Sequence, residues 1–259
     1  MREPEPRVGR EETGPADSTG AGESRLVWDY FKRRAEGKFV DVGANHPTER
    51  NLTWFLECQG WSGLLVEPQP EMCKLLRAHR PRSRTIEAAV CGPGQEGHGE
   101  LHLAVAAAKS SLRPEWDHAL TGQTIRVRTR TLNSLFAEED IDGMDFLSLD
   151  VEGMELPALW GLDLGRYQPQ LILIEDHFYG LEKHSYLRKH GYKLVRRTGY
   201  NNWYVPWSAP VSVFSMSNLP ELLRLGRKMW LNMPFDRVRH RLKGRKHARA
   251  GAGYTGPRH

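Results

Sequence analysis

Two acidic side chains end successive apolar runs in the first third of the chain, and each is placed to hold a polar ligand. The run that begins at Phe39 leads into Asp41 and Gly43, and the next apolar run ends at Glu67. Because glycine has no Cβ, a turn at Gly43 can bring backbone N–H groups close to a ligand. An acid at the end of the following strand can accept hydrogen bonds from ribose hydroxyls. The pair favours a ligand that contains a nucleoside, although Asp41 and Gly43 alone would also fit a simple turn.

A second group of polar residues follows two later apolar runs. Asp150 ends the run 146–150, and Glu175, Asp176 and His177 follow the run 171–174. If both runs are central strands of a parallel sheet, these side chains face one crevice. Asp150 or His177 could then remove the proton from a substrate hydroxyl. Alternatively, Asp150 with Glu175 or Asp176 could hold Mg²⁺, whose charge would lower the pKa of that hydroxyl. Asp150, His177 and Glu175 are therefore the candidate catalytic residues.

Two further acids close to this crevice have a structural alternative. Glu152 and Glu155 follow Asp150 at the expected start of a helix. Negative charge is favourable at a helix N-terminus, so these side chains could cap the helix instead of facing a substrate. The sequence leaves both roles open.

The apolar pattern between residues 25 and 206 predicts the elements that position these residues. Short apolar runs alternate with stretches of helical spacing, which is typical of a parallel sheet covered by helices. The predicted helices are 48–59 and 71–80, and the predicted strands are 38–42, 63–67, 84–90, 146–150, 171–175, 192–196 and 202–205. Residues 99–105 and 125–129 predict extra strands, with a long irregular loop at 106–123 between them. The fold class is therefore α/β.

Length and composition predict one large domain with two flanking segments. The 259 residues are 39% hydrophobic, which is enough for one sizeable core. Residues 1–24 are rich in Glu, Gly, Pro and Arg and predict a disordered leader, followed by the folded domain at 25–210. Residues 211–259 predict a basic, partly helical extension. The three cysteines have no CxxC spacing, so neither a disulfide framework nor a cysteine-based zinc site is expected.

Charge is concentrated at the C-terminal end. Residues 224–259 carry eleven Lys or Arg and one acid, Asp236. This segment could contact anionic membrane or a lipid-linked substrate, or it could be a helix packed on the domain with a solvated basic end. Nucleic acid is not an expected partner, because the bases elsewhere are balanced by acids. With no apolar signal peptide and no run long enough for a membrane span, the expected compartment is the cytoplasm, with possible peripheral membrane contact.

Several blocks of sequence, in order, resemble the FkbM-type S-adenosylmethionine-dependent methyltransferases. The resemblance covers residues 39–206 and rests on DVGAN (41–45), VEP (66–68), EAAV (87–90), SSL (110–112), TLN (131–133), FLSLDVEGME (146–155) and NNWYVP (201–206). It implies a Rossmann-like class I methyltransferase fold, a seven-stranded, mostly parallel sheet with helices on both faces and an antiparallel last strand. Six residues are implied to bind S-adenosylmethionine, namely Asp41, Gly43 and Asn45 at the methionine part, Glu67 at the ribose, and Glu87 and Ala88 near the adenine.

The resemblance also selects the expected reaction, which is O-methylation of a hydroxyl on a saccharide, glycolipid or secondary metabolite. The cofactor supplies the reactive methyl group, so the protein must position the acceptor and take its proton. Two alternatives stay open. One is a non-catalytic cofactor-binding or membrane-associated scaffold protein, and the other is N-methylation of a protein or small molecule.

Overall fold

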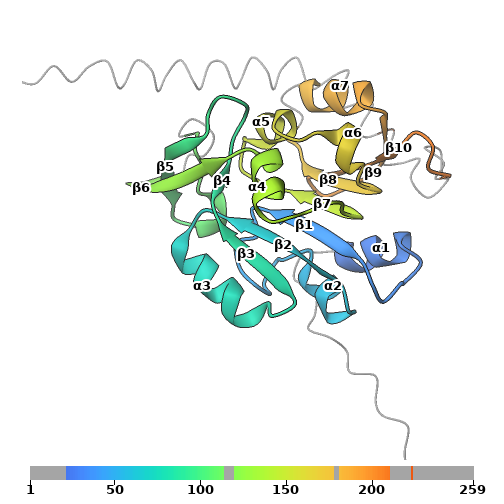
Figure 1. Cartoon of the computed structure of the whole chain (residues 1–259), viewed down its shortest axis with the longest axis horizontal. Helices are drawn as coiled ribbons and strands as arrows, with labels where there is room; N and C mark the ends of the chain where they lie inside the picture. The colour runs from blue at the N-terminus through green and yellow to red at the C-terminus, as the bar shows by residue number, and fades with distance from the viewer. Residues whose placement is uncertain (1–21, 114–119, 178–180, 211–222, 224–259) are drawn as a thin grey trace, which may run out of the picture.

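A seven-stranded sheet forms the centre of the computed structural model, which describes residues 22–113, 120–177, 181–210 and 223 (Figure 1). In spatial order its strands are β3 (Ser83–Glu87), β2 (Ser62–Glu67), β1 (Lys38–Val42), β7 (Phe146–Leu149), β8 (Leu171–Glu175), β10 (Asn201–Pro206) and β9 (Tyr192–Thr198). The first five of these strands are parallel, and β10 is antiparallel to both of its neighbours. The predicted Rossmann-like class I methyltransferase sheet with an antiparallel last strand is confirmed.

Helices cover both faces of this sheet (Figure 1). Side chains of β1 alternate between the faces, so that Phe39 and Val40 belong to different apolar clusters. The cluster of Phe39 includes residues of α1 (Glu23–Tyr30), α2 (Trp54–Cys58) and α3 (Pro70–His79). The cluster of Val40 includes residues of α4 (Leu132–Glu138), α5 (Glu155–Trp160), α6 (Leu164–Tyr167) and α7 (Glu182–Lys189). Among the helices of the described residues, none combines the length and the hydrophobicity that a membrane span requires.

A smaller, three-stranded sheet accounts for the predicted extra strands. It contains β4 (Ala89–Val90), β6 (Leu120–Arg130) and β5 (Gly97–Ala104), with the short 3₁₀ helix η1 (Ala107–Lys109) after β5. The prediction of one continuous strand at 84–90 is wrong. The chain leaves the central sheet at Ala88, whose N–H donates to the carbonyl oxygen of Glu67 at 3.1 Å. This break directs the following residues into the smaller sheet.

Two predicted boundaries also differ from the structure. The helix predicted at 48–59 begins only at Trp54, because Asn51 Oδ1 accepts the N–H groups of Thr53 and Trp54 and holds the preceding residues in a turn. The leader predicted at 1–24 extends too far, since α1 begins at Glu23 and both Glu23 and Ser24 are buried. The leader up to residue 21 lies outside the described residues, as do residues 114–119 of the predicted loop and all of the basic extension except Leu223.

Candidate active site

The turn after β1 is shaped by Gly43, which has a left-handed φ of +85°. A Cβ at this position would lie 1.8 Å from the carbonyl oxygen of Asp150, just after β7. The N–H groups of Gly43 and Ala44 both donate to the carbonyl oxygen of Val66, at 2.9 and 3.2 Å. These two N–H groups are therefore not presented to a ligand. The expectation that glycine at position 43 serves to bring backbone N–H groups close to a ligand is wrong for these two groups. Glycine is needed because the turn passes directly against the chain that follows β7.

Asp41 lies buried in β1, beneath this turn. Its Oδ2 accepts hydrogen bonds from Thr53 Oγ1 at 2.8 Å and from Asn51 Nδ2 at 3.4 Å. Burial raises the pKa of Asp41, whereas these donors and the charge of Arg80 act in the opposite direction. The surrounding donors therefore offset part of the cost of keeping a buried carboxylate charged.

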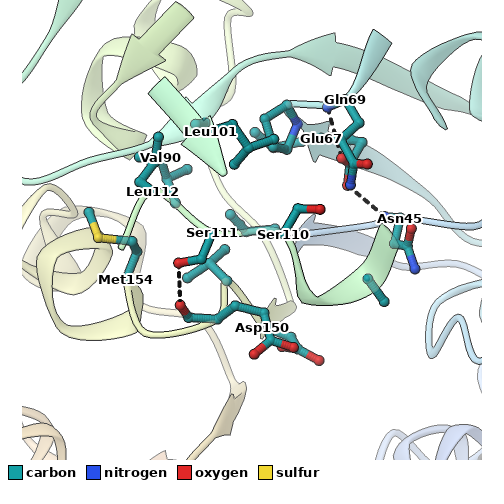
Figure 2. A pocket seen from close by; sticks show the side chains of 18 of the residues that line it. Asn45, Glu67, Gln69, Val90, Leu101, Ser110, Ser111, Leu112, Asp150 and Met154 are labelled. Carbon is teal, nitrogen blue, oxygen red and sulfur yellow. Dashed lines mark hydrogen bonds between the residues drawn. The ribbon is translucent and has the colours of Figure 1, made fainter. Parts of the chain in front are cut away.

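Glu67 ends β2, and backbone N–H groups fix its carboxylate. Its Oε2 accepts the N–H of Asn45 at 2.8 Å, and its Oε1 accepts the N–H of Gln69 at 2.9 Å (Figure 2). Burial raises the pKa of Glu67 to about 7, although the two N–H groups work against this rise. A carboxylate oxygen has two lone pairs, so each oxygen can still accept a further donor such as a hydroxyl.

A first hollow opens beside Glu67, between the end of the central sheet and the smaller sheet (Figure 2). Its walls are mainly apolar side chains, namely Val42, Val66, Ala88, Ala89, Val90, Leu101, Leu112, Val151 and Met154. Glu67, Asn45 and Asp150 add polar groups to this lining. The Oδ1 atom of Asn45 is buried and has no hydrogen-bond partner in the described part of the chain. An apolar hollow with a few fixed polar groups is typical of a site for a small organic ligand.

The structure separates the two residues that were expected near an adenine. Ala88 lines the first hollow, but Glu87 is not among the described residues of its lining. The Glu87 side chain is 45% exposed, and its Oε2 lies 3.7 Å from Arg77 Nη1 on α3. Glu87 therefore takes part in a surface ion pair outside the first hollow, and its place near the adenine stays a prediction.

Ser111 joins the smaller sheet to the loop after β7, a connection that the sequence did not reveal. Its Oγ donates to the carbonyl oxygen of Glu152 at 2.7 Å (Figure 2). Its backbone pairs with His102 of β5, and its side chain and that of Ser110 line the first hollow. The signal in the sequence was the SSL block alone, because neither apolar spacing nor charge marks these residues.

Three carboxyl groups gather after β7 and β8, and we call Asp150, Glu152 and Glu175 the acidic group. One oxygen of each lies within 4.8 Å of an oxygen of the others. His177 Nε2 lies 3.3 Å from Glu175 Oε1, so the structure brings together all three predicted catalytic residues. Such hard oxygen donors could hold a divalent cation, and the same carboxylates could also accept a proton.

Two members of the acidic group, Asp150 and Glu152, retain protons at higher pH than isolated carboxyl groups would, whereas Glu175 does not. The Asp150 side chain is in contact with water on one side and with protein on its other sides. Desolvation by the surrounding protein raises the pKa of Asp150 well above its ordinary value, and the charges of Glu175 and Glu152 raise it further. Burial opposes ionisation of Glu175, but hydrogen bonding and charge from His177 and a hydrogen bond from Asp150 lower its pKa. The two carboxyl groups titrate as a pair, because their oxygens lie within 4.8 Å of each other and the charge of one disfavours ionisation of the other.

Asp176 lies outside the acidic group, so its predicted place in a metal site with Asp150 and Glu175 is wrong. It is buried on another side of the chain, where its Oδ1 lies 3.2 Å from Lys183 Nζ and its Oδ2 accepts Asn202 Nδ2 at 3.0 Å. Side chains of successive residues at a strand end point in different directions, which separates Asp176 from Glu175. Glu152 occupies the third position instead.

Glu155 has a structural role, as the first residue of α5, but it forms no side-chain cap on that helix. Its Oε1 accepts the N–H of Gly153 at 2.9 Å, and its Oε2 lies 3.3 Å from Lys183 Nζ. Lys183 also donates to the carbonyl oxygen of Glu175 at 2.8 Å, so this partly buried cation links α5 and the end of β8 to α7. Lys183 was missed because nothing in its helical surroundings in the sequence distinguishes it from a surface lysine.

We expect a Glu152→Gln substitution to stabilise the protein at pH 8 but not at pH 4. Desolvation and the charge of Glu175 raise the pKa of Glu152 from the ordinary 4.5 to about 7. An acid with a raised pKa in the folded state loses stability as pH rises from the ordinary value through the raised one, and glutamine avoids this loss. The free energy of unfolding in urea should increase by roughly 1–2 kcal/mol at pH 8, after allowance for partial exposure. An equal change at both pH values would contradict the assignment.

A second hollow lies on the other side of Gly43 and Asp150, and these two residues line both hollows. The second hollow follows the ends of β1, β7 and β8 and is more polar than the first. Its polar lining consists of Glu23, Asp41, Arg50, Asn51, Ser148, Asp150, Glu175, Thr198, Tyr200 and Asn201. Two ligand sites that share a wall at Asp150 suit the transfer of a group between two molecules.

The turn between β9 and β10 forms one side of the second hollow and is held by α1. The carboxylate of Glu23 accepts hydrogen bonds from Thr198 Oγ1, from Asn201 Nδ2 at 2.8 Å and from Trp203 Nε1 at 3.3 Å. Between these anchors the exposed ring of Tyr200 lies over His177, with ring centroids 4.6 Å apart. Sequence reasoning missed Glu23 because it assigned this residue to the leader.

Solved structures that resemble the chain are distant in sequence. A putative methyltransferase, yhhF, from Escherichia coli is 9% identical with a TM-score of 0.40, and the match covers 71% of this chain and 84% of that one. A TehB-like SAM-dependent methyltransferase from Corynebacterium glutamicum is 15% identical with a TM-score of 0.38, covering 71% and 87%. A Burkholderia thailandensis 1,6-didemethyltoxoflavin-N1-methyltransferase with bound S-adenosylhomocysteine is 12% identical with a TM-score of 0.38, covering 73% and 77%. No curated protein matches the chain.

The match to a protein family is direct. The sequence profile of the methyltransferase FkbM domain matches residues 41–194, which is more than half of the chain. The matched region begins at Asp41 and includes Glu67, the acidic group and His177, so it contains the ends of β1, β2, β7 and β8. The chain therefore belongs to the FkbM family of S-adenosylmethionine-dependent methyltransferases.

Proposed function

We propose that the chain transfers the methyl group of S-adenosylmethionine to a hydroxyl of a saccharide, glycolipid or secondary metabolite. One observation carries the proposal, which is that the two hollows meet at Asp150, where one oxygen of Asp150 lies within 4.8 Å of an oxygen of Glu175. Methyl transfer to oxygen requires that two bound molecules meet in line and that a nearby group takes the hydroxyl proton. The junction of the hollows supports both requirements.

The first hollow suits the cofactor. Glu67 has lone pairs left for ribose hydroxyls, and Ala88 lies on an apolar wall suited to the adenine. Gly43 and Asn45 line the part of the first hollow proposed for the methionine part, and the buried, unpartnered Oδ1 of Asn45 is an acceptor left for a ligand donor. Asp41 lies on the other side of the turn, where it lines the second hollow, so its proposed part in cofactor binding is to hold the turn. When bound, S-adenosylmethionine supplies an electrophilic methyl group on a positively charged sulfur.

The second hollow suits the acceptor, and Asp150 is the proposed base. The acceptor oxygen bonds to the methyl carbon, the carbon–sulfur bond breaks with its electron pair going to sulfur, and the hydroxyl proton goes to Asp150. Because its pKa is raised, Asp150 must first be in its ionised form, and a nearby positive charge favours that form. His177, 3.3 Å from Glu175, helps to hold the remaining negative charge.

A second arrangement uses the acidic group as ligands for Mg²⁺. The donors fit in kind, because all three are carboxylate oxygens and lie within 4.8 Å of one another. With the ion bound, these carboxylates would stay ionised and the ion would lower the pKa of the acceptor hydroxyl. Treatment with EDTA separates the two arrangements, since only the metal-dependent one loses turnover and regains it with Mg²⁺.

The polar lining of the second hollow supports a hydroxyl-rich acceptor. Asn51, Ser148, Thr198, Tyr200 and Asn201 offer neutral hydrogen-bonding groups beside the acids. The test is S-adenosylhomocysteine release by the full chain with a panel of glycans, lipid extracts, hydroxylated metabolites and amines, followed by mass analysis of the product. A methyl ether product supports the proposal. N-methyl products alone, or no turnover with any acceptor despite cofactor binding, would reject it in favour of an N-methyltransferase or a non-catalytic scaffold.

A further inference from the structure

A buried arginine lies directly behind the turn proposed to hold the cofactor. Arg80 follows α3, and its side chain is 0% exposed. Its Nε lies 2.7 Å from Glu57 Oε2, and Glu57 is also buried. A buried ion pair adds little to stability compared with apolar residues of similar size. The position of this cation therefore calls for a reason other than packing.

The guanidinium of Arg80 makes three hydrogen bonds to the segment that joins the turn at Gly43 to α2. Its Nη1 donates to Asn51 Oδ1 at 2.9 Å and to the carbonyl oxygen of Pro47 at 3.2 Å. Its Nη2 donates to Thr53 Oγ1 at 3.0 Å. The rigid fork of donors in arginine matches such a set, whereas lysine offers a single charged nitrogen.

These contacts extend to Asp41 and to the backbone beside Gly43. Thr53 accepts from Arg80 and donates through the same oxygen to Asp41 Oδ2, at 2.8 Å. Asn51 accepts from Arg80 and donates through Nδ2 to the carbonyl oxygen of Ala44, also at 2.8 Å. One buried cation therefore orients two side chains that in turn hold the carboxylate and the turn.

We propose that Arg80 is a positioning residue for cofactor binding. Arg80 acts through Thr53 and Asn51, which fix the carboxylate of Asp41 and the turn at Gly43. Arg80 is not itself among the described residues that line either hollow, so it has no direct contact there. The inference rests on the proposed cofactor site and adds a residue to it.

The charge of Arg80 also affects the ionisation of Asp41. The groups that favour ionised Asp41 are Thr53 and Asn51 beside it, Ser148 on β7 and Arg80. Burial opposes them, and the other charged side chains of the second hollow are Glu23, Arg50, Asp150 and Glu175. The Thr53 hydrogen bond is the largest of these favourable effects, so its loss raises the pKa of Asp41, and Asp41 then takes up a proton at higher pH.

The test is calorimetric titration of S-adenosylmethionine into the full chain between pH 6 and pH 8, for Arg80→Lys and Thr53→Val. Thr53→Val preserves the side-chain shape and the Arg80–Glu57 pair, so it tests the connection even if Arg80→Lys does not fold. We expect both variants to bind S-adenosylmethionine about 10- to 100-fold more weakly than the wild type at pH 6, and to show a smaller loss of affinity at pH 8. This size of effect is usual for the loss of a hydrogen bond to a charged group. Lys74→Met, which removes an exposed cation from α3, should leave affinity unchanged.

An Asp41→Asn variant separates failure of this inference from failure of the cofactor site. If Asp41→Asn loses affinity while folded Thr53→Val binds like the wild type at every pH, the inference is wrong and the site stands. A loss in Thr53→Val that is equal at all pH values would indicate a structural role only and would also overturn it. If folded Asp41→Asn binds normally, both the site and the inference fail.

Discussion

An Asp150→Asn variant is expected to bind S-adenosylmethionine with near wild-type affinity but to transfer the methyl group about 10²–10⁴-fold more slowly, the usual effect of removing a general base. Asparagine has nearly the same shape and can donate its amide N–H to Glu175, so the junction between the hollows should keep its form. The amide cannot accept the hydroxyl proton. The measurement is a single-turnover rate with an acceptor identified in the panel, alongside cofactor affinity by calorimetry.

The pH dependence of that rate gives a second readout. The pKa of Asp150 lies well above its ordinary value, so the wild-type rate should rise with pH as Asp150 loses its proton. This rise should be absent in Asp150→Asn. An Asp142→Asn variant, which changes an exposed carboxylate at the opposite edge of the sheet, should behave like the wild type. Wild-type turnover in a folded Asp150→Asn variant would leave Asp150 without a role in proton transfer.

A Gly43→Ala variant is expected to lose both stability and cofactor binding. The left-handed φ of +85° costs a residue with a Cβ about 1–2 kcal/mol, and the new Cβ would overlap the carbonyl oxygen of Asp150 at 1.8 Å. Relieving this overlap requires the turn and the chain after β7 to move apart, which separates Asp150 from the first hollow. Thermal unfolding and calorimetric titration of S-adenosylmethionine measure the two effects.

Gly143→Ala provides a matched control for this substitution. A Cβ at Gly143 would meet no atom within 4 Å, and its backbone is not left-handed. That variant should unfold at a temperature close to the wild-type value and bind the cofactor equally well. If Gly43→Ala matches Gly143→Ala in both measurements, the close approach of the turn to Asp150 does not matter for the site.

The central sheet and the gathering of the catalytic candidates could be predicted from the sequence. Asp150 and Glu175 follow apolar runs, and parallel strands place their carboxyl ends at one edge, so adjacency of β7 and β8 brings these residues together. The same rule places Glu67 beside the turn at Gly43, since β2 pairs with β1. These predictions need only strand positions and strand order.

Side-chain direction at strand ends could not be predicted in this way. Glu175 and Asp176 are neighbours in sequence, but one joins the acidic group and the other pairs with Lys183. Glu87 and Ala88 were both expected near the adenine, yet the chain turns at Ala88 into another sheet, so that only Ala88 lines the first hollow and Glu87 pairs with Arg77 on the surface. A shift of one residue in the end of a strand changes which side chain faces a site. Sequence patterns do not place strand ends to within one residue.

Contacts between distant segments were also beyond the sequence. Glu23 reaches Asn201 and Trp203, and Arg80 reaches Glu57 and Thr53, in each case through tertiary packing. A charged residue in a polar stretch is normally read as exposed, because burying a charge is costly unless partners surround it. Those partners become visible only when the chain is folded.

Calorimetric titration of S-adenosylmethionine into the purified full chain tests the central claim most directly. We predict binding of one molecule per chain and weaker binding in Asp41→Ala and Glu67→Ala, each of which removes a charged hydrogen-bond acceptor worth about 1.5–3 kcal/mol. The unfolding temperature of each variant, measured in the same buffer, would establish that it is folded. Absence of binding to the wild-type chain, or unchanged affinity in both folded variants, would contradict the claim that the turn after β1 and the end of β2 form the cofactor site.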